Sequence, residues 1–385
     1  MIRILDSSNC CGCSACKSIC PCEAITMKPD GMGFLYPELD MTLCVDCGLC
    51  EKVCAFNDHY DRSYNLSTPE AFAVRHKNID EVLTSRSGAA FIALSDWILD
   101  HGGVVYGAGY IDHFRVIHKR AETKEYRNEF KGSKYVQSDL NDIFKKVKSD
   151  LNQDRLVLFS GTPCQISGLA SFVGTELRSK LYLIDIVCHG VPSPFVWRDY
   201  IHYVEKQVGE MAVSVDFRDK TELGWASHKE SFTFPSKKIY RKTYTYLFYE
   251  HIMFRPSCAV CHFTNLQRPG DITIADFWGW EKTDASINKD DKGVSLVLCN
   301  TKKGQELLDS VSKDLHIVKT DVSRCLQPNL LNPSCFSPQW KDFEKKYVDK
   351  GFEYVAKRYG DLGFRYLYKR FKQKSKTAIK LILNK

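Results

Sequence analysis

The 385-residue sequence lacks any hydrophobic run long enough to cross a membrane as a helix. Its longest apolar runs, such as Leu181 to Ile184, have the length of strands, whereas a bilayer helix needs about 20 apolar residues. The first nine residues lack the apolar core of a secretory signal peptide. Hydrophobic residues (44%) and charged residues (26%) exclude a mostly disordered, collagen-like or low-complexity chain. We therefore expect a cytoplasmic protein of two or three domains.

Cysteine, by contrast, is abundant, with 17 residues in the chain. A cytosolic protein is kept reduced, and an odd count does not fit a framework of disulfides. Binding of a metal or of an iron–sulfur cluster is the simplest explanation for so many thiols.

Eight of the cysteines form two runs with the same spacing, C-x2-C-x2-C-x3-C, which begin 34 residues apart. The runs are Cys10, Cys13, Cys16 and Cys20, and Cys44, Cys47, Cys50 and Cys54. This spacing is typical of bacterial ferredoxins with two [4Fe-4S] clusters, in which the fourth cysteine of each run binds the other cluster. A pair of zinc sites, the alternative, needs two spaced cysteine pairs per site.

The ferredoxin pattern assigns ligands to both clusters. We expect Cys10, Cys13, Cys16 and Cys54 at one cluster, and Cys44, Cys47, Cys50 and Cys20 at the other. The fourth cysteine of each run is expected to begin a helix that points away from its own loop. Cys11 and Cys22 are left over by this count. Short strands are predicted at residues 24–27 and 34–36, around a turn at Pro29-Asp30-Gly31.

After a polar linker at residues 58–69, the chain alternates between strand and helix patterns. A strand at 71–75 precedes the polar turn Ser85-Arg86-Ser87-Gly88, a helix at 89–99 and a strand at 104–106. The free N–H groups and the dipole of such a helix N-terminus suit a phosphate, although an ordinary N-cap explains the turn equally well. The segment from Lys131 to Tyr135 adds cationic donors, or is a solvated loop.

Three further strands end in loops of unusual composition. The strands are expected at 156–159, 181–187 and 271–275, and Cys164, Cys188 and Asp276 follow them. In open α/β sheets, ligands bind beyond the carboxyl ends of the strands. A C-x2-C pair lies between the second and third strands. Four cysteines could therefore meet at one sheet edge, for a cluster or for zinc, unless they are only core residues: Cys164, Cys188, Cys258 and Cys261.

Together these motifs resemble the coenzyme F420 hydrogenase/dehydrogenase beta subunit family, fused to an N-terminal two-cluster ferredoxin domain. The resemblance spans residues 70–300 and rests on seven motifs that occur in the family's order. They are Ser85 to Ala89, Gly132 to Ser138, Gly161 to Gln165, Cys188 to Ser193, Phe217 to Lys220 with Gly224 and Trp225, Cys258 to Cys261, and Asp271 to Gly279.

The resemblance implies an α/β domain that binds FAD and receives electrons from iron–sulfur clusters. It implies a third [4Fe-4S] cluster at the four cysteines of the sheet edge. Contacts with the FAD phosphates would come from Ser87, Gly88, Gly132, Ser133 and Lys134. Contacts with the flavin would come from Thr162, Gln165 and His189. His189 could also relay a proton, or could simply make a loop hydrogen bond.

The resemblance does not identify the electron acceptor of this chain, because nothing in the sequence specifies coenzyme F420. Some chains of this kind belong to surface-polysaccharide gene clusters. Arg218, Lys220 and Asp276 are candidates to orient an acceptor, or are surface ion pairs.

The fold class expected is mixed α/β, with a dicluster ferredoxin module followed by an α/β flavin-binding domain. The predicted parts are the ferredoxin domain (1–60), an N-terminal α/β domain (70–150), a C-terminal domain with the flavin and the third cluster (151–345), and a basic amphipathic helix (346–385).

The net positive charge of the chain is concentrated in its C-terminal tail. Residues 357–385 hold ten Lys or Arg and one acid, Asp361, so the tail contributes +9 to a net charge of +7, and the rest contributes −2. Such local charge does not indicate a nucleic-acid-binding core. An amphipathic basic helix can lie on the inner membrane face, or can pack on the body of the protein.

The leading hypothesis is an iron–sulfur flavin-dependent oxidoreductase. A ferredoxin-like donor or partner redox subunit would supply electrons, which would pass through the clusters to FAD and to a two-electron acceptor. The alternatives are an electron-transfer subunit that serves a partner hydrogenase, dehydrogenase or reductase, and a flavin-free assembly protein in a surface-sugar pathway.

Overall fold

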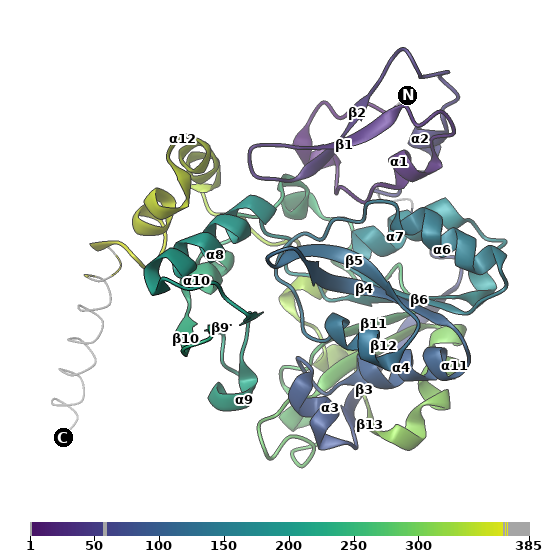
Figure 1. Ribbon diagram of the computed structural model, residues 1–385. Coiled ribbons are helices and arrows are strands. Elements are labelled where there is room, and N and C mark those ends of the chain that lie inside the picture. The colour runs from purple at the N-terminus through teal and green to yellow at the C-terminus, as the bar shows by residue number, and fades with distance from the viewer. Residues whose placement is uncertain (1, 57–59, 365, 367, 369–385) are drawn as a thin grey trace.

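The computed structural model describes residues 2–56, 60–364, 366 and 368. An N-terminal module lies against a central mixed sheet, and a lobe of helices and short strands lies beside that sheet (Figure 1). Within these residues, no helix combines the length and the apolar character that crossing a membrane requires. The first part of the predicted tail helix (346–385) belongs to α12 (Trp340–Arg358), and its residues 365, 367 and 369–385 lie outside the described part.

The N-terminal module has a two-stranded sheet and two short helices. Strands β1 (Ile25–Pro29) and β2 (Leu35–Leu39) are antiparallel, and Ile25 lies opposite Leu39. The carboxylate of Asp30 closes the turn by accepting the backbone N–H groups of Met32 and Phe34, both at 2.9 Å. The predicted hairpin is therefore present, with each strand slightly later in the chain.

The helices of this module correct one expectation. Helix α1 (Ala15–Ile19) contains Cys16 and ends before Cys20, and helix α2 (Leu49–Lys52) ends before Cys54. The fourth cysteine of each run thus follows a helix and does not begin one. The chain turns earlier, because the residue before each helix, Ser14 or Gly48, has a left-handed backbone with a φ of 60° or 74°.

The central sheet has eight strands in the order β13-β3-β12-β11-β7-β6-β4-β5. Strands β4, β6, β7 and β11 are parallel to one another, and the other neighbouring pairs are antiparallel. The bounds are β3 (Asn65–His76), β4 (Val104–Ile111), β5 (Arg115–Ala121), β6 (Val157–Gly161), β7 (Leu181–Ile186), β11 (Ile272–Asp276), β12 (Ser295–Thr301) and β13 (Leu315–Thr320). Strand β3 begins within the predicted linker, because Asn65 pairs with Thr301.

Helices cover both faces of this sheet. Alternate residues of a strand point to opposite faces, so Val105 and Leu158 pack on one face and Val104 and Val157 on the other. The first face is covered by α4 (Ala90–Asp100) and α11 (Lys302–Ser310), and the second by α6 (Ile143–Asn152) and α7 (Pro163–Val173). Two short helices, α3 (Ile79–Thr84) and α5 (Lys124–Arg127), complete this part.

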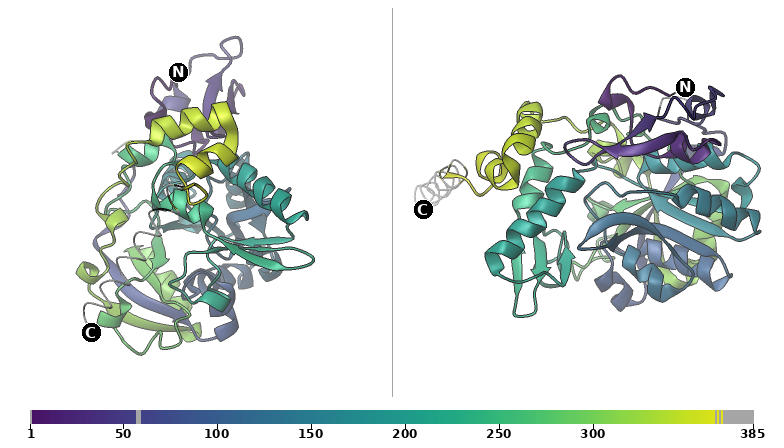
Figure 2. Two further views of the ribbon diagram at one scale, coloured as in Figure 1. Left: turned by 90° about the vertical axis from the view of Figure 1, so that its left-hand side faces the viewer. Right: turned by 45° about the horizontal axis from the view of Figure 1, so that its top comes forward.

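A second unit, the aromatic lobe (residues 194–249 and 340–358), packs its own core beside the sheet (Figure 2). Large aromatic side chains dominate that core, among them Trp197, Tyr200 and Phe232. The predicted boundary at 345/346 falls inside its last helix. The elements are α8 (Pro194–Val208), β8 (Ser214–Asp216), α9 (Lys220–Leu223), β9 (Glu230–Thr233), β10 (Lys238–Arg241), α10 (Thr243–Tyr249) and α12 (Trp340–Arg358).

One buried ion pair fixes the middle of the sheet. The carboxylate of Asp185 on β7 accepts hydrogen bonds from Arg268 Nη2 at 2.8 Å and from the backbone N–H of Gly270 at 3.0 Å. The side chains of Asp185 and Arg268 are 0% and 1% exposed. Removing one partner would leave the other charge buried without compensation.

We predict that Asp185→Ala destabilises the sheet by about 3–5 kcal/mol, because Arg268 keeps its charge in the core. Urea unfolding followed by circular dichroism would measure the effect. The matched control is Glu306→Ala, which removes the exposed partner of Lys302 and should change stability by less than about 1 kcal/mol. Equal midpoints for the two variants would contradict the prediction.

Candidate functional site

The N-terminal module brings its eight cysteines together in two groups. In the first cysteine group (Cys10, Cys13, Cys16 and Cys54), burial and the charges of the other three thiols raise the pKa of Cys16. The second cysteine group (Cys20, Cys44, Cys47 and Cys50) lines a small hollow of about 20 Å³, together with Cys22. Each group combines three cysteines of one run with the fourth cysteine of the other, as the ferredoxin spacing predicts.

A third cysteine group lies at the junction of the module and the sheet. It consists of Cys164 at the start of α7, Cys188 after β7, and Cys258 and Cys261 around a short 3-10 helix (Pro256–Val260). Burial, followed by the charges of Cys164 and Cys261, raises the pKa of Cys188 to about 12. Thiols so poorly hydrated need a positive centre in order to ionise, and iron or zinc would supply it.

Cys11, which the spacing leaves over, connects the first and third groups. Its thiol is buried, and the neighbouring thiols of Cys13 and Cys164 raise its pKa. The contact from Cys11 lowers the pKa of Cys164 to about 7. Gly168 on α7 permits this approach, because a Cβ there would lie 2.7 Å from the sulfur of Cys13.

A single buried guanidinium joins the module to the body. Arg255 is fully buried, and its Nε donates to the carbonyl of Cys10 at 2.7 Å. Its Nη2 donates to the carbonyl of Leu35 at 2.9 Å, and its Nη1 to Gln137 Oε1 at 3.0 Å. Nη2 also lies 3.6 Å from the sulfur of Cys10, so a fixed positive charge stands beside the first group.

A cavity of about 330 Å³ opens at the carboxyl ends of β6, β7 and β11. This volume lies in the range of about 300–1,000 Å³ that is usual for ligand pockets. Seven of the eight residues predicted to contact FAD line it: Ser87, Gly132, Ser133, Lys134, Thr162, Gln165 and His189. Gly88 does not line it. It lies against β3, where a Cβ would come within 2.2 Å of the carbonyl oxygen of Val74.

The cavity wall holds unsatisfied polar groups beside the predicted phosphate residues. Ser85 Oγ and two nitrogens of Arg86, Nε and Nη2, are buried and have no hydrogen-bond partner within the described residues. Both residues line the cavity. Burial also lowers the pKa of Lys134 to about 7. An anionic group placed here would satisfy donors that the protein leaves open, so the residues fit a phosphate.

Sequence reasoning named the turn that contains Arg86 but not Arg86 itself. A cationic residue between two serines before a helix was the available signal. Arg86 stands out only when the hydrogen-bond partners of its guanidinium are compared with those of its neighbour. The neighbouring guanidinium of Arg218 is already paired with Asp276 at 2.5 Å, whereas Arg86 is only partly satisfied.

The three residues predicted to orient an electron acceptor, Arg218, Lys220 and Asp276, occupy buried or partly buried positions. Arg218 and Asp276 form an ion pair in the cavity wall with side-chain exposures of only 6% and 12%, so they are not a surface pair. Lys220 is buried behind the wall, where its Nζ donates to the carbonyl of Ser87 at 3.0 Å. Burial lowers the pKa of Lys220 to about 7.

Thr162 and Gln165 belong to a buried hydrogen-bond chain. Gln165 Oε1 accepts the backbone N–H of Thr162 at 3.0 Å, and Gln165 Nε2 donates to Ser138 Oγ at 2.9 Å. Ser138 Oγ lies 2.9 Å from His118 Nδ1, and His118 Nε2 lies 3.0 Å from the carbonyl of Ser160. Burial lowers the pKa of His118 to about 4, so the ring is neutral at pH 7. His118 lies outside the seven sequence motifs, and Ser138 ends one of them but received no predicted role.

His189 forms a pair with a second histidine. Its Nε2 lies 2.6 Å from Nε2 of His251, and His251 Nδ1 lies 2.8 Å from the carbonyl of Cys335. A carbonyl only accepts, so His251 Nδ1 carries a proton, its Nε2 accepts, and His189 Nε2 is the donor. Burial lowers the pKa of His189 to about 4, which keeps this ring neutral.

Comparison with known proteins identifies two domains. Residues 154–324 match the family described as the C terminus of the beta subunit of coenzyme F420 hydrogenase/dehydrogenase, and residues 9–57 match a 4Fe-4S dicluster domain. These matches agree with the resemblance found in the sequence and support an iron–sulfur protein.

Two individual proteins are similar over different extents. One is an iron-sulfur subunit of the CoB–CoM heterodisulfide reductase of Methanocaldococcus jannaschii, which is 35% identical over an alignment of 65 residues that covers 14% of this chain. The chain spans about a tenth (10%) of the length of that relative. The other is a structure of the F420-reducing [NiFe] hydrogenase complex from Methanosarcina barkeri. It is 18% identical, with a TM-score of 0.48, and the alignment covers 78% of this chain and 96% of that one.

We predict that Arg255→Met loosens the module, because it leaves one buried and two partly buried acceptors without their donor, and an unsatisfied buried acceptor costs about 1–3 kcal/mol. Hydrogen exchange should become faster across residues 10–54, whereas β6 and β7 should keep their rates. The matched control is Lys17→Met, which removes a partly exposed contact between module and body, the 3.0 Å ion pair with Asp142. Unchanged exchange in Arg255→Met would show that other contacts hold the module.

Proposed function

We propose that this chain, which contains a 4Fe-4S dicluster domain and a C-terminal domain of the coenzyme F420 hydrogenase/dehydrogenase beta subunit family, is an iron–sulfur flavoprotein oxidoreductase. It takes electrons from a ferredoxin-like donor and delivers them to a two-electron acceptor. The main support for the proposal is that the three cysteine groups form a continuous series that ends at the cavity. The cysteine groups lead from the module to the cavity, and Cys188 belongs both to the third group and to the cavity wall.

The three cysteine groups would each hold one [4Fe-4S] cluster. Each supplies four thiols, the number that such a cluster needs. The contacts of Cys11 with Cys13 and Cys164 support close spacing of the first and third groups. Arg255 and Gln137 fix the backbone of the first run by hydrogen bonds to Cys10 and Cys11. Clusters, when bound, supply one-electron transfer.

The cavity would hold FAD, which, when bound, interconverts single electrons and electron pairs. Ser85, Arg86, Ser87 and Lys134 would bind its phosphates, with Gly132 and Ser133 offering backbone N–H groups. Thr162 and Gln165 form a rigid wall, because their polar atoms are already bonded to each other and to Ser138. His189 would contact the flavin or acceptor as a neutral ring through Nδ1, which accepts, because its Nε2–H is already donated to His251.

The proposed entry point is the exposed end of the module. Cys47 is exposed, and four large apolar side chains around the second run, Met41, Leu43, Val45 and Leu49, are also exposed, Val45 by 66%. Clustered exposed apolar residues mark a docking surface, here for the donor or for a partner redox subunit. The same feature favours the alternative function, an electron-transfer subunit whose partner holds the substrate site.

The acceptor, including one from surface-polysaccharide metabolism, stays a prediction, as do a cytoplasmic location and contact of the basic tail with the inner membrane face. The proposed division into domains 1–60, 70–150, 151–345 and 346–385 likewise stays a proposal.

The first test is the FAD content of the chain purified without oxygen, where we expect about one FAD per chain. Arg86→Met should weaken FAD binding about 10- to 100-fold, since a charge-assisted hydrogen bond contributes about 1.5–3 kcal/mol. Arg115→Met, at a side chain 60% exposed, is the control and should bind FAD normally. No flavin after reconstitution with FAD would overturn the flavoprotein proposal and favour the electron-transfer subunit.

The second test concerns the path of the electrons. Stopped-flow absorbance would follow the reduction of bound flavin by a low-potential ferredoxin. Cys44→Ser and Cys258→Ser should each slow it by more than about tenfold, because each removes a ligand of one cluster. Cys22→Ser is the control, since Cys22 lies beside the second group but outside the spacing pattern. Equal rates in all four proteins would exclude this path.

A further inference from the structure

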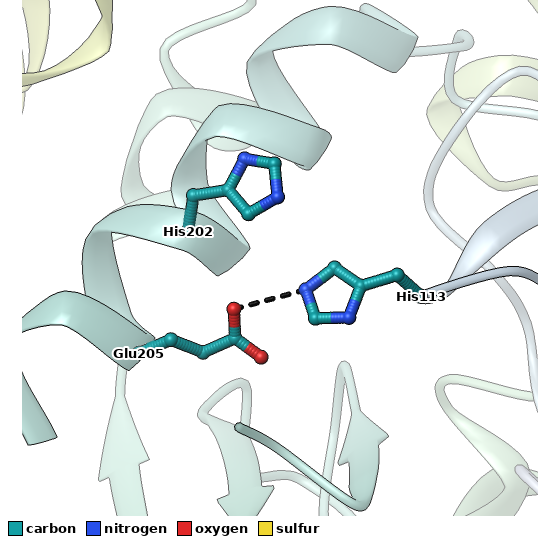
Figure 3. A group of neighbouring side chains, drawn as sticks. All are labelled: His113, His202 and Glu205. Carbon is teal, nitrogen blue, oxygen red and sulfur yellow. Dashed lines mark hydrogen bonds and ion pairs between the residues drawn. The ribbon is translucent and has the colours of Figure 1, made fainter. Parts of the chain in front are cut away.

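Two histidines and a glutamate, none of which lines the cavity, come together between the β4–β5 turn and α8 (Figure 3). His113 lies in the turn between β4 and β5, and His202 and Glu205 lie three residues apart on α8. Residues at this spacing share one helix face. One ligand atom from each side chain lies within 4.8 Å of the other two, and His113 Nε2 lies 2.9 Å from Glu205 Oε2.

Burial and a backbone hydrogen bond fix the orientation of the Glu205 side chain. The side chain is only 6% exposed, and its Oε1 accepts the backbone N–H of Ala212 at 2.9 Å. The other carboxylate oxygen, Oε2, therefore points toward the histidines. A carboxylate oriented by a hydrogen bond to its second oxygen is the usual arrangement of a metal ligand.

The turn that carries His113 is also held against α8. Asp112, His113 and Phe114 have left-handed backbones with φ values of 34°, 51° and 64°. Three such residues in succession, none of them glycine, persist only where the surroundings impose them. The indole Nε1 of Trp197 on α8 donates to the carbonyl of Phe114 at 3.0 Å. His113 is thereby directed at the helix.

We propose that His113, His202 and Glu205 bind a divalent transition-metal ion of the zinc class. Two imidazoles and a carboxylate form a usual donor set for zinc, whereas calcium and magnesium prefer oxygen ligands alone. His202 is exposed and can turn to complete the set. Solvent would fill the fourth position.

The proposed ion would connect the central sheet with the aromatic lobe. His113 belongs to the β4–β5 hairpin of the sheet, and the other two ligands belong to α8. Helix α8 begins directly after Ser193, which closes the loop that carries Cys188 and His189. The ion would thus hold the lobe in a fixed position relative to one wall of the cavity. This role is independent of the proposed electron transfer.

The test is the zinc content of the cluster-loaded chain after anaerobic dialysis against Zn²⁺, measured by mass spectrometry together with iron. Iron at full content shows that the cysteine groups are occupied by clusters and are closed to zinc. We expect the wild type to hold about one zinc more per chain than His202→Ala. His316→Ala, an exposed histidine on β13 at the opposite edge of the sheet, is the control and should match the wild type.

A second measurement separates a specific site from loose surface binding. Zinc should raise the thermal unfolding midpoint of the wild type and of His316→Ala, but not that of His202→Ala. Because His202 is exposed, its replacement leaves the core unchanged. Equal zinc content in the wild type and His202→Ala, or an equal rise of the midpoint in both, would overturn the proposal.

Discussion

The buried guanidinium of Arg255 is the constraint on which the arrangement of the cysteine groups depends. Its hydrogen bonds end on Cys10 and Leu35 of the module and on Gln137 of the body. It lies three residues before Cys258, in the segment that supplies two thiols of the third group. One side chain therefore fixes both sides of the junction between the first and third cysteine groups. A buried charge that makes several hydrogen bonds tolerates little displacement, so the junction is rigid.

The sheet imposes the second constraint. Strands β6, β7 and β11 are parallel, so their carboxyl ends lie at one edge, and the loops with Cys164, Cys188 and Asp276 meet there. This explains why the cavity and the third group share a wall. Strands β3 and β11 are both antiparallel to β12, so β3 also ends at this edge and brings the turn with Ser87 to the cavity. Strand β5 is antiparallel to β4, so the segment with Gly132 to Lys134 reaches the cavity only because the chain after β5 returns to this edge.

Much of this arrangement is predictable because it depends on local signals. The cysteine spacing indicates both groups of the module, and the apolar runs at 156–159 and 181–187 predict strands whose ends carry cysteines. The aromatic lobe is not predictable in this way, because its strands have only three or four residues and their pairing depends on distant partners. The role of Arg86 is hidden for another reason. Whether a guanidinium is satisfied depends on the neighbours that the fold supplies, here Arg218 and Asp216.

The positions of the cysteine groups also determine how easily dissolved oxygen would reach a cluster bound at each of them. The second group includes the exposed Cys47, whereas Cys10 of the first group lies behind Arg255 and the third group lies beneath the module. Dissolved oxygen would reach a cluster at the outer position long before one at the inner positions. Under the proposed function, exposure to air would therefore break the path from the donor first, while clusters at the inner groups would stay intact. Damage in that order could be repaired by rebuilding a single outer cluster without unfolding the rest of the protein.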